Sequence, residues 1–162
     1  GLLVKYRIIS VGKIQEPFYI MGINEYLKRL GPYTRIELVQ GLEEKTSPRA
    51  GPKEIERILA KEGERIIRLL GKDSILVLMD AQGIQLSSED FAQKIREWDQ
   101  GPKSRIDILV GASYGFSAAV RKRADLMISF SRMTFPHQMA VLILMEQIYR
   151  GYKIMKGEPY HK

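Results

Sequence analysis

The stretch Ser129–Tyr149, SFSRMTFPHQMAVLILMEQIY, joins the end of an apolar strand to a long helix predicted over Gln138–Ile154. Five apolar residues follow one another in Val141–Met145, so the first half of this helix has no polar stripe. A helix that is apolar on every side has to be buried on every side. C-terminal helices usually lie on the outside of a domain, so we predict that a second copy of the chain covers the outer face. Burial at the centre of a monomer is the alternative reading.

Strands and helices alternate upstream of this stretch. Strands are predicted over residues 4–11, 35–39, 74–79, 106–110 and 126–130. Amphipathic helices are predicted after Pro17, after Pro52 (with Gly71 as its cap), after Ser87 and over 117–124. The central strands are apolar on both faces, a pattern typical of a parallel sheet that helices cover on each side. The sequence therefore predicts one α/β domain over residues 1–162.

Composition narrows the class of function. Lys and Arg outnumber Asp and Glu by 26 to 19, and the net charge of +7 indicates an anionic partner, most commonly nucleic acid. The absence of cysteine excludes disulfides, a catalytic thiol and cysteine-ligated zinc, and with two histidines we expect no metal centre. The longest apolar run is far shorter than the ~20 residues of a membrane span. The first residues lack a signal-peptide pattern, so we expect a cytoplasmic protein.

Three loops follow directly from the carboxyl ends of predicted strands, at 80–83, 111–115 and 129–134. Ligands of open parallel sheets bind in the crevice outside these strand ends. Glycines such as Gly83 and Gly111 allow the backbone to approach a ligand closely. The chain contains neither G-x-G-x-x-G nor G-x-x-x-x-G-K-[ST], which argues against dinucleotide and nucleoside-triphosphate binding.

A serine hydrolase is an alternative because Gly111–Gly115 matches the nucleophile elbow G-x-S-x-G. Its triad would consist of Ser113, Asp125 and either His137 or His161. The acid follows Ser113 by only twelve positions and precedes the next strand, so it would have to fold back across its own helix. We therefore predict that Ser113 is not a nucleophile.

Three motifs close the chain: Phe-Pro-His-Gln at 135–138, Glu-Gln-x-Tyr-Arg at 146–150 and Tyr-His-Lys at 160–162. Together they resemble the ribosomal RNA large subunit methyltransferase H family, a group within the SPOUT superfamily. The similarity begins at Ile9–Lys13 and covers nearly the whole chain. Ala112 stands where the family often has a second glycine, a change that could tighten the pocket, and residues 1–3 precede the usual start of the family.

The resemblance implies a parallel-sheet SPOUT methyltransferase fold with a trefoil knot in its C-terminal half. It also implies a homodimer and S-adenosylmethionine as the cofactor. The methyl group would go to N3 of a pseudouridine in 23S ribosomal RNA. We expect the RNA to be methylated within the large subunit or the whole ribosome, because so small a chain lacks a separate RNA-binding domain. A non-catalytic RNA-binding knotted domain is a further alternative. Carried over by position, the expected cofactor contacts are Met79, Gly111, Phe130, Ser131, Arg132, Met133, Thr134 and Phe135.

The expected catalytic residues are Arg150, Tyr160 and His161. N3 carries an imide proton that has to leave as the methyl group arrives. Arg150 would bind phosphate or stabilise charge on the base oxygens, and Tyr160 or His161 would accept the proton or stack on the base. The competing interpretations are an ordinary ion pair for Arg150 and a disordered chain end for His161. For His137 we predict a structural role in shaping the loop that precedes the last helix.

Overall fold

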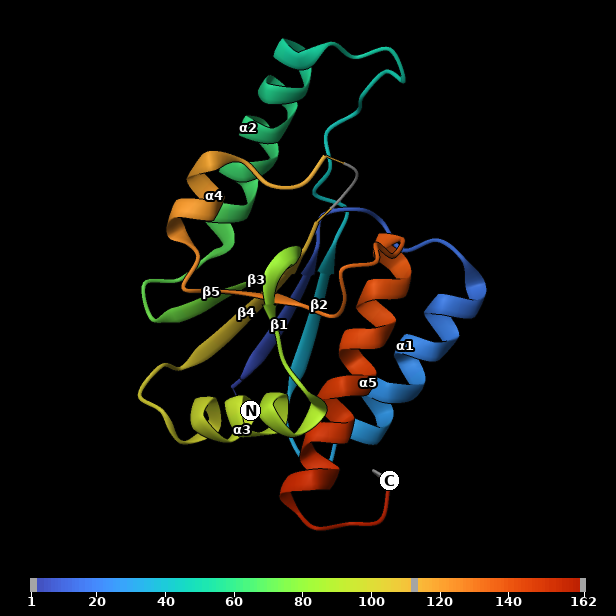
Figure 1. Cartoon of the computed structure of the whole chain (residues 1–162), viewed down its shortest axis with the longest axis vertical. Helices are drawn as coiled ribbons and strands as arrows, with labels where there is room; N and C mark the ends of the chain where they lie inside the picture. Colours follow the sequence, from blue (N-terminus) through green and yellow to red (C-terminus); the bar gives the residue numbers. More distant parts are fainter. Residues whose placement is uncertain (1–2, 112–113, 161–162) are drawn as a thin grey trace.

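A five-stranded parallel sheet forms the centre of the molecule in the computed structural model, which describes residues 3–111 and 114–160 (Figure 1). The strand order is β2-β1-β4-β3-β5, and all four pairings are parallel, as the apolar strands predicted. The strands are β1 (Tyr6–Ser10), β2 (Ile36–Gln40), β3 (Ser74–Gln85), β4 (Arg105–Val110) and β5 (Leu126–Ser129).

Helices cover both faces of this sheet. One face carries α1 (Pro17–Leu30), α3 (Ser88–Gln100) and α5 (His137–Met155), and the other carries α2 (Pro52–Leu69) and α4 (Ala118–Arg123). In Figure 1, α1 and α5 lie side by side to the right of the strands, and α2 and α4 lie together at the upper left. On β4, Ile108 faces the layer of α1, α3 and α5, and Leu109 faces the layer of α2 and α4. Both side chains are fully buried. The two-sided apolar pattern of the central strands therefore follows from their position between two helical layers.

The helices begin where the sequence predicted. Pro17 and Pro52 occupy the first helical positions of α1 and α2. The hydroxyl of Ser87 accepts a hydrogen bond from the backbone of Asp90 at 3.0 Å and caps α3. The predicted end of α2 is wrong: the helix ends at Leu69, and Leu70, rather than Gly71, is its C-cap in an extended conformation.

Strand β3 is longer than predicted. We expected a loop at 80–83, but β3 continues to Gln85, and its pairing with β5 shifts in register between Met79 and Ile84. A Cβ added at Gly83 would lie 2.7 Å from the backbone nitrogen of Ile128. Polar residues and glycine suggested a turn here, whereas the glycine lets the extended strand pass close to its neighbour.

Helix α5 packs between α1 and α3 on the sheet. Val141, Leu144 and Met145 are buried within the single chain, but Leu142 and Ile143 are only half-buried. Neighbouring helices thus cover more of α5 than we expected, and the half-buried Leu142 and Ile143 leave an apolar strip on this helix. The trefoil knot stays a prediction. Within residues 3–111 and 114–160, no helix is both long and apolar enough to cross a membrane.

Candidate functional site

A cavity of about 270 Å³ lies where β4 and β5 end, beside residues 79–81 in the middle of β3. Its wall brings together segments that are far apart in the sequence. Arg132 is exposed and lies outside this wall. The other seven residues predicted to contact the cofactor all line it, namely Met79, Gly111, Phe130, Ser131, Met133, Thr134 and Phe135.

A second cavity of about 290 Å³ adjoins the first and shares Met79, Phe130 and Phe135 with it. Its far wall comes from the start of α3 and from one side of α5, at Ile143 and Gln147. Met79 is 9% exposed, so it belongs to the core and to both walls at once. Together the two cavities reach the range of about 300–1,000 Å³ that is usual for small-molecule sites.

Gly111 lines the cavity, and its missing side chain leaves room for a neighbouring ring. A Cβ added there would lie 2.9 Å from the ring of Phe116, which also lines the wall and is buried. The glycine therefore lets the Phe116 ring pack closely against the backbone, so that Gly111 and Phe116 form one part of the wall. The mixture of apolar side chains, hydroxyls and accessible backbone therefore fits a nucleoside-containing cofactor such as S-adenosylmethionine.

Hydroxyl groups shape the loop that follows β5. The Ser129 hydroxyl donates to the carbonyl of Ser131 at 2.7 Å and accepts from the Ser131 amide at 3.1 Å. The Ser131 hydroxyl accepts from the amide of Met133 at 3.1 Å. These short-range bonds hold the loop backbone against the cavity. Ser129 lines the cavity but was missed by the sequence reasoning, which treated it only as the start of a loop.

The Phe-Pro-His-Gln motif connects this loop to the segment after β1. Nε2 of His137 lies 3.0 Å from the carbonyl oxygen of Lys13. The side-chain oxygen of Gln138 accepts from the amides of Gln15 and Glu16 at 2.9 and 3.0 Å. A Cβ added at Gly12 would lie 2.5 Å from His137 Nε2, so a glycine is needed there. These contacts agree with the structural role predicted for His137.

A salt bridge that the sequence did not reveal holds Asp80, a residue of the first cavity's wall. Arg121 on α4 bonds to Asp80 on β3 at 2.9 Å, and its guanidinium lies 5.8 Å from the centroid of Phe116. Asp80 and Phe116 both line the cavity. The two charged residues are 41 positions apart, and no local pattern connects them.

Two of the three predicted catalytic residues meet at the C-terminal half of α5. The Tyr160 hydroxyl donates to Glu146 at 3.0 Å, Arg150 bonds to the same carboxylate at 3.0 Å, and the Arg150 guanidinium lies 4.8 Å from the Tyr160 ring. Burial raises the pKa of Tyr160, and hydrogen bonds to Tyr26 and Glu146 raise it further. The hydrogen bond to Glu146 also raises the pKa of Arg150. His161 lies outside the described residues.

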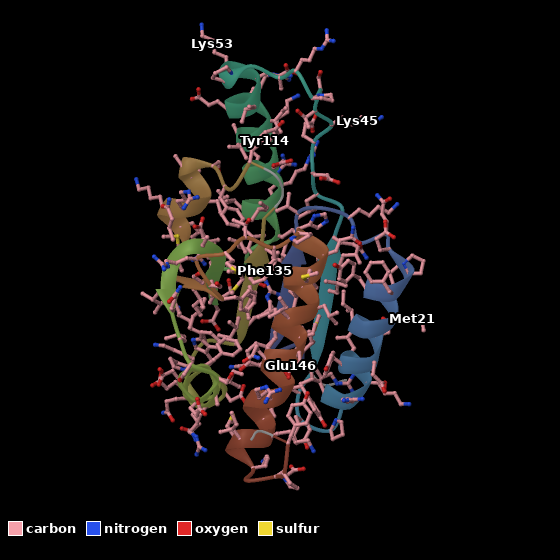
Figure 2. The ribbon with its side chains drawn as sticks, turned by 45° about the vertical axis from the view of Figure 1, so that its right-hand side comes forward. Met21, Lys45, Lys53, Tyr114, Phe135 and Glu146 are labelled. Atoms are coloured by element: carbon pink, nitrogen blue, oxygen red, sulfur yellow. The ribbon has the colours of Figure 1, made fainter. Side chains whose placement is uncertain are left out.

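This C-terminal cluster is separate from the chain's own first cavity. Arg150 follows His137 by thirteen positions, which corresponds to about 20 Å along a helix. Figure 2 shows Phe135 near the upper end of α5 and Glu146 lower on the same helix. Neither cavity wall includes Arg150 or Tyr160. The structure thus groups the predicted cofactor contacts at one place and the predicted catalytic residues at another.

The hydrolase triad is not assembled in the described residues. Ser113 lies outside them, but Asp125 precedes β5 at the amino edge of the sheet, where it accepts from the Leu76 amide at 2.8 Å and pairs with Arg123 at 3.0 Å. His137 lies at the carboxyl edge. Helix α4 carries the chain from one edge to the other, and this separates the proposed acid from the histidine.

Comparisons with known proteins agree with this geometry. A family model described as "Predicted SPOUT methyltransferase" matches residues 4–161. Proteins named "Ribosomal RNA large subunit methyltransferase H" from Syntrophomonas wolfei and Carboxydothermus hydrogenoformans are 60% and 46% identical, each over 98% of this chain and 100% of the relative. A solved structure of a probable methylase family protein from Haemophilus influenzae shares the fold, with a TM-score of 0.55 and 14% identity over 99% of this chain and 72% of that one. The chain belongs to the SPOUT methyltransferase family.

Proposed function

We propose that this protein methylates N3 of a pseudouridine in 23S ribosomal RNA. As a SPOUT methyltransferase it is an enzyme that uses S-adenosylmethionine. Relatives that match over their whole length are named for ribosomal RNA of the large subunit. The observation that carries the proposal is the cavity at the carboxyl edge, since seven of the eight residues expected to hold the cofactor converge there from three separate segments.

The cavity residues would bind and orient the cofactor. When bound, S-adenosylmethionine supplies a sulfonium-activated methyl group. The backbone of Gly111 and of the loop 130–135 would bond to the adenine, while Met79, Phe130 and Phe135 would form the apolar wall. Such a wall excludes water, and the hydrogen bonds of Ser129 and Ser131 keep the loop in place before binding.

The C-terminal residues would act on the target base. Arg150 carries a permanent positive charge and would stabilise negative charge on the base oxygens as the N3 proton leaves. Tyr160 or His161 would accept that proton or stack on the base. The base has to be exposed, which favours a single-stranded loop as the substrate. We infer that such a loop is presented by the large subunit or the whole ribosome in the cytoplasm.

A homodimer would bring the cofactor site and the catalytic residues together. Phe18 and Met21 on α1 are 62% and 72% exposed, although both are apolar. The same strip continues onto α5, because a Cβ added at Gly22 would lie 2.9 Å from half-buried Leu142. A continuous exposed apolar surface of this kind is typical of a subunit interface. Pairing through it would place the C-terminal residues of one subunit against the cofactor cavity of its partner.

Methyl transfer to ribosomes tests the activity. Purified protein and tritiated S-adenosylmethionine should label ribosomes that lack the modification, and mass spectrometry should identify the product as N3-methylated pseudouridine. Ribosomes that already carry the methyl group serve as the control and should accept no label. Label in a different nucleoside, or in ribosomal protein, would contradict the proposed substrate.

Mixed dimers test whether the site is shared. One subunit is deleted after Pro159, and the other is blocked at the cofactor site by Gly111→Leu. A shared site leaves one complete centre and about half of the wild-type activity, while both parent homodimers are inactive. An inactive mixed dimer, shown to be intact by light scattering, would mean that each subunit works alone.

A further inference from the structure

Glu146 on α5 is the point at which the polar side chains of the C-terminal cluster meet. Its carboxylate accepts from the Tyr160 hydroxyl at 3.0 Å and from Arg150 Nε at 3.1 Å, and it pairs with Arg150 Nη2 at 3.0 Å. Gln147 donates to its other oxygen at 2.8 Å. Both oxygens therefore have partners, and two of the three are predicted catalytic residues.

A short chain of hydrogen bonds connects Glu146 to the second cavity. The side-chain nitrogen of Gln147 donates to Glu146, and its oxygen accepts from the Ser88 hydroxyl at 2.7 Å. Ser88 and Gln147 both line this cavity, which shares Met79, Phe130 and Phe135 with the first. Glu146 thus lies between the region that would hold the cofactor and the residues that would act on the base.

The geometry of this pair differs from that of ordinary surface ion pairs in the same chain. The Glu146 and Arg150 side chains are 20% and 25% exposed, and two nitrogens of Arg150 contact the carboxylate. On α2, Glu64 and Arg68 have the same i,i+4 spacing but are 70% and 75% exposed and lie 3.8 Å apart. Exposed pairs contribute little because water screens them, whereas a partly buried, multiply bonded pair restricts the side chains that it holds.

We propose that Glu146 is a positioning residue that holds Arg150 and Tyr160 in the arrangement in which they meet the target base. Gln147 keeps the Glu146 carboxylate oriented by anchoring it to Ser88 on the cavity wall. Glu146 itself neither exchanges the N3 proton nor contacts the cofactor; it removes the rotational freedom of the two groups that do the work. This inference rests on the proposed function of Arg150 and Tyr160.

The variant Glu146→Gln tests the role with little change in shape. The amide keeps the side-chain volume but loses the charge that pairs with Arg150. Misplacing a catalytic group by about 1 Å costs on the order of a hundred-fold in rate, so we expect a loss of that order in kcat. The KM for ribosomes and the affinity for S-adenosylmethionine, measured by calorimetry, should stay within about two-fold of wild type. Glu64→Gln is the matched control, because it removes the same charge from an i,i+4 pair, and it should leave all three quantities unchanged.

The milder variant Glu146→Asp keeps the charge but shortens its reach by one methylene group. It should remain folded by circular dichroism and show a smaller loss of kcat than Glu146→Gln. An unchanged kcat in both folded variants would overturn the proposal. A loss of cofactor affinity equal to the loss of kcat would also overturn it, because Glu146 would then be part of the cofactor wall.

Two mixed dimers locate the effect. In the first, one subunit carries Glu146→Gln and its partner carries Gly111→Leu; in the second, one subunit carries both substitutions and its partner is wild type. If Glu146 acts through C-terminal residues that reach the partner, the first keeps about half of the activity and the second is nearly inactive. Where the Pro159-deletion dimer has shown that the site is shared, the reverse result would place the action of Glu146 in its own subunit's cofactor site and overturn the proposal.

These outcomes are distinguishable from failure of the proposed function. Unlabelled ribosomes with the wild-type protein would refute the substrate assignment, and an inactive dimer of the Pro159 deletion with Gly111→Leu would refute sharing. If sharing fails while the wild-type protein is active, the kcat of the Glu146→Gln homodimer still decides the positioning role. A hundred-fold loss with retained cofactor affinity supports it, and an unchanged rate refutes it.

Discussion

Single glycines determine whether the cavity can exist. At Gly111 the ring of Phe116 occupies the space that any side chain would need, and at Gly12 the imidazole of His137 does so. Both neighbours line the cavity wall. Neither glycine has a positive φ, so the requirement is steric and comes from close approach rather than from an unusual backbone conformation.

Gly111→Leu should abolish binding of S-adenosylmethionine without unfolding the protein. The new side chain has to displace Phe116 or occupy the cavity itself, since its Cβ would lie 2.9 Å from that ring. Overpacking costs about 1–3 kcal/mol, which is less than the stability of a typical domain. Calorimetry should detect no binding, while thermal unfolding stays cooperative. Gly51→Leu is the control, because a Cβ there meets nothing within 4 Å; wild-type affinity in Gly111→Leu would contradict the assignment.

Gly12→Ala should destabilise the protein by about 1–3 kcal/mol, because its Cβ would lie 2.5 Å from His137 Nε2 and break the contact with the Lys13 carbonyl. The substitution His137→Ala removes the ring that causes the clash. In the His137→Ala background, Gly12→Ala should therefore lower the free energy of unfolding much less than it does in the wild type. Urea unfolding of the wild type, the two single variants and the double variant measures this coupling. Strictly additive losses of unfolding free energy would show that the two residues do not interact.

Elements that are distant in sequence are joined by buried polar contacts. The hydroxyls of Tyr6 on β1 and Tyr152 on α5 both donate to Asp99 on α3, at 2.6 and 2.7 Å. On the other face of the sheet, Arg7 on β1 pairs with Asp107 on β4 at 2.9 Å and donates to the carbonyl of Leu69 at the end of α2. Each of these contacts fixes how one helix meets the sheet, and a buried group of this kind is costly to leave without its partner.

The Tyr6–Asp99–Tyr152 contact should make stability fall at alkaline pH. Burial is the largest cause that raises the pKa of both tyrosines above the ordinary value of 10.0. The folded state therefore retains protons that the unfolded chain loses, so the stabilising effect is complete below about pH 10 and decreases as the pH rises further. The free energy of unfolding in urea should decline above about pH 10, and less steeply in Tyr6→Phe and Tyr152→Phe. The same slope in all three proteins would exclude these tyrosines as the cause.

At the scale of the whole molecule, the separation of the predicted cofactor contacts from the predicted catalytic residues is the reason for proposing a second subunit. The first cavity is built within one chain, whereas Arg150 lies on the C-terminal half of α5 and Tyr160, in the segment after this helix, bonds to Glu146 on it. The exposed apolar strip of α1 and α5 runs beside these residues on the same layer of helices (Figure 2), where Met21 projects from the outer side of α1.

Met21→Glu should therefore give a folded monomer that binds S-adenosylmethionine but does not methylate ribosomes. The side chain is 72% exposed in the single chain, so a charge there leaves the fold intact but opposes burial in an interface. Light scattering measures the mass, and calorimetry and methyl transfer measure the two functions. Ile67→Glu, on α2 at the opposite layer, introduces the same charge at another exposed apolar position and should remain a dimer. A fully active monomer would contradict both the dimer and the shared site.

Local pattern was sufficient for much of the fold. Two-sided apolar runs such as Ile106–Val110 predict a parallel sheet because only central strands are covered on both faces. Prolines and serines at helix starts act through neighbouring backbone groups, so the positions of α1, α2 and α3 were also predictable. The loops predicted at the strand ends indicated where the cavity lies, since the carboxyl ends of parallel strands meet at one edge, although 80–83 proved to be part of β3. The individual cavity residues were predicted from the family resemblance.

Contacts between distant residues were decided only by the tertiary structure. The strand order, the extension of β3 past Gly83 and the exclusion of Arg132 from the cavity wall depend on which segments lie side by side. The Asp80–Arg121 bridge and the buried Arg7–Asp107 pair join residues with no spacing that marks them as partners. The position of Glu146 between Arg150 and Tyr160 is a mixed case. Its i,i+4 relation to Arg150 is visible in the sequence, but the bond to Tyr160 requires the C-terminal segment to fold back along α5. Periodicity reports how a residue relates to its own helix or strand, and packing alone determines which other elements that residue meets.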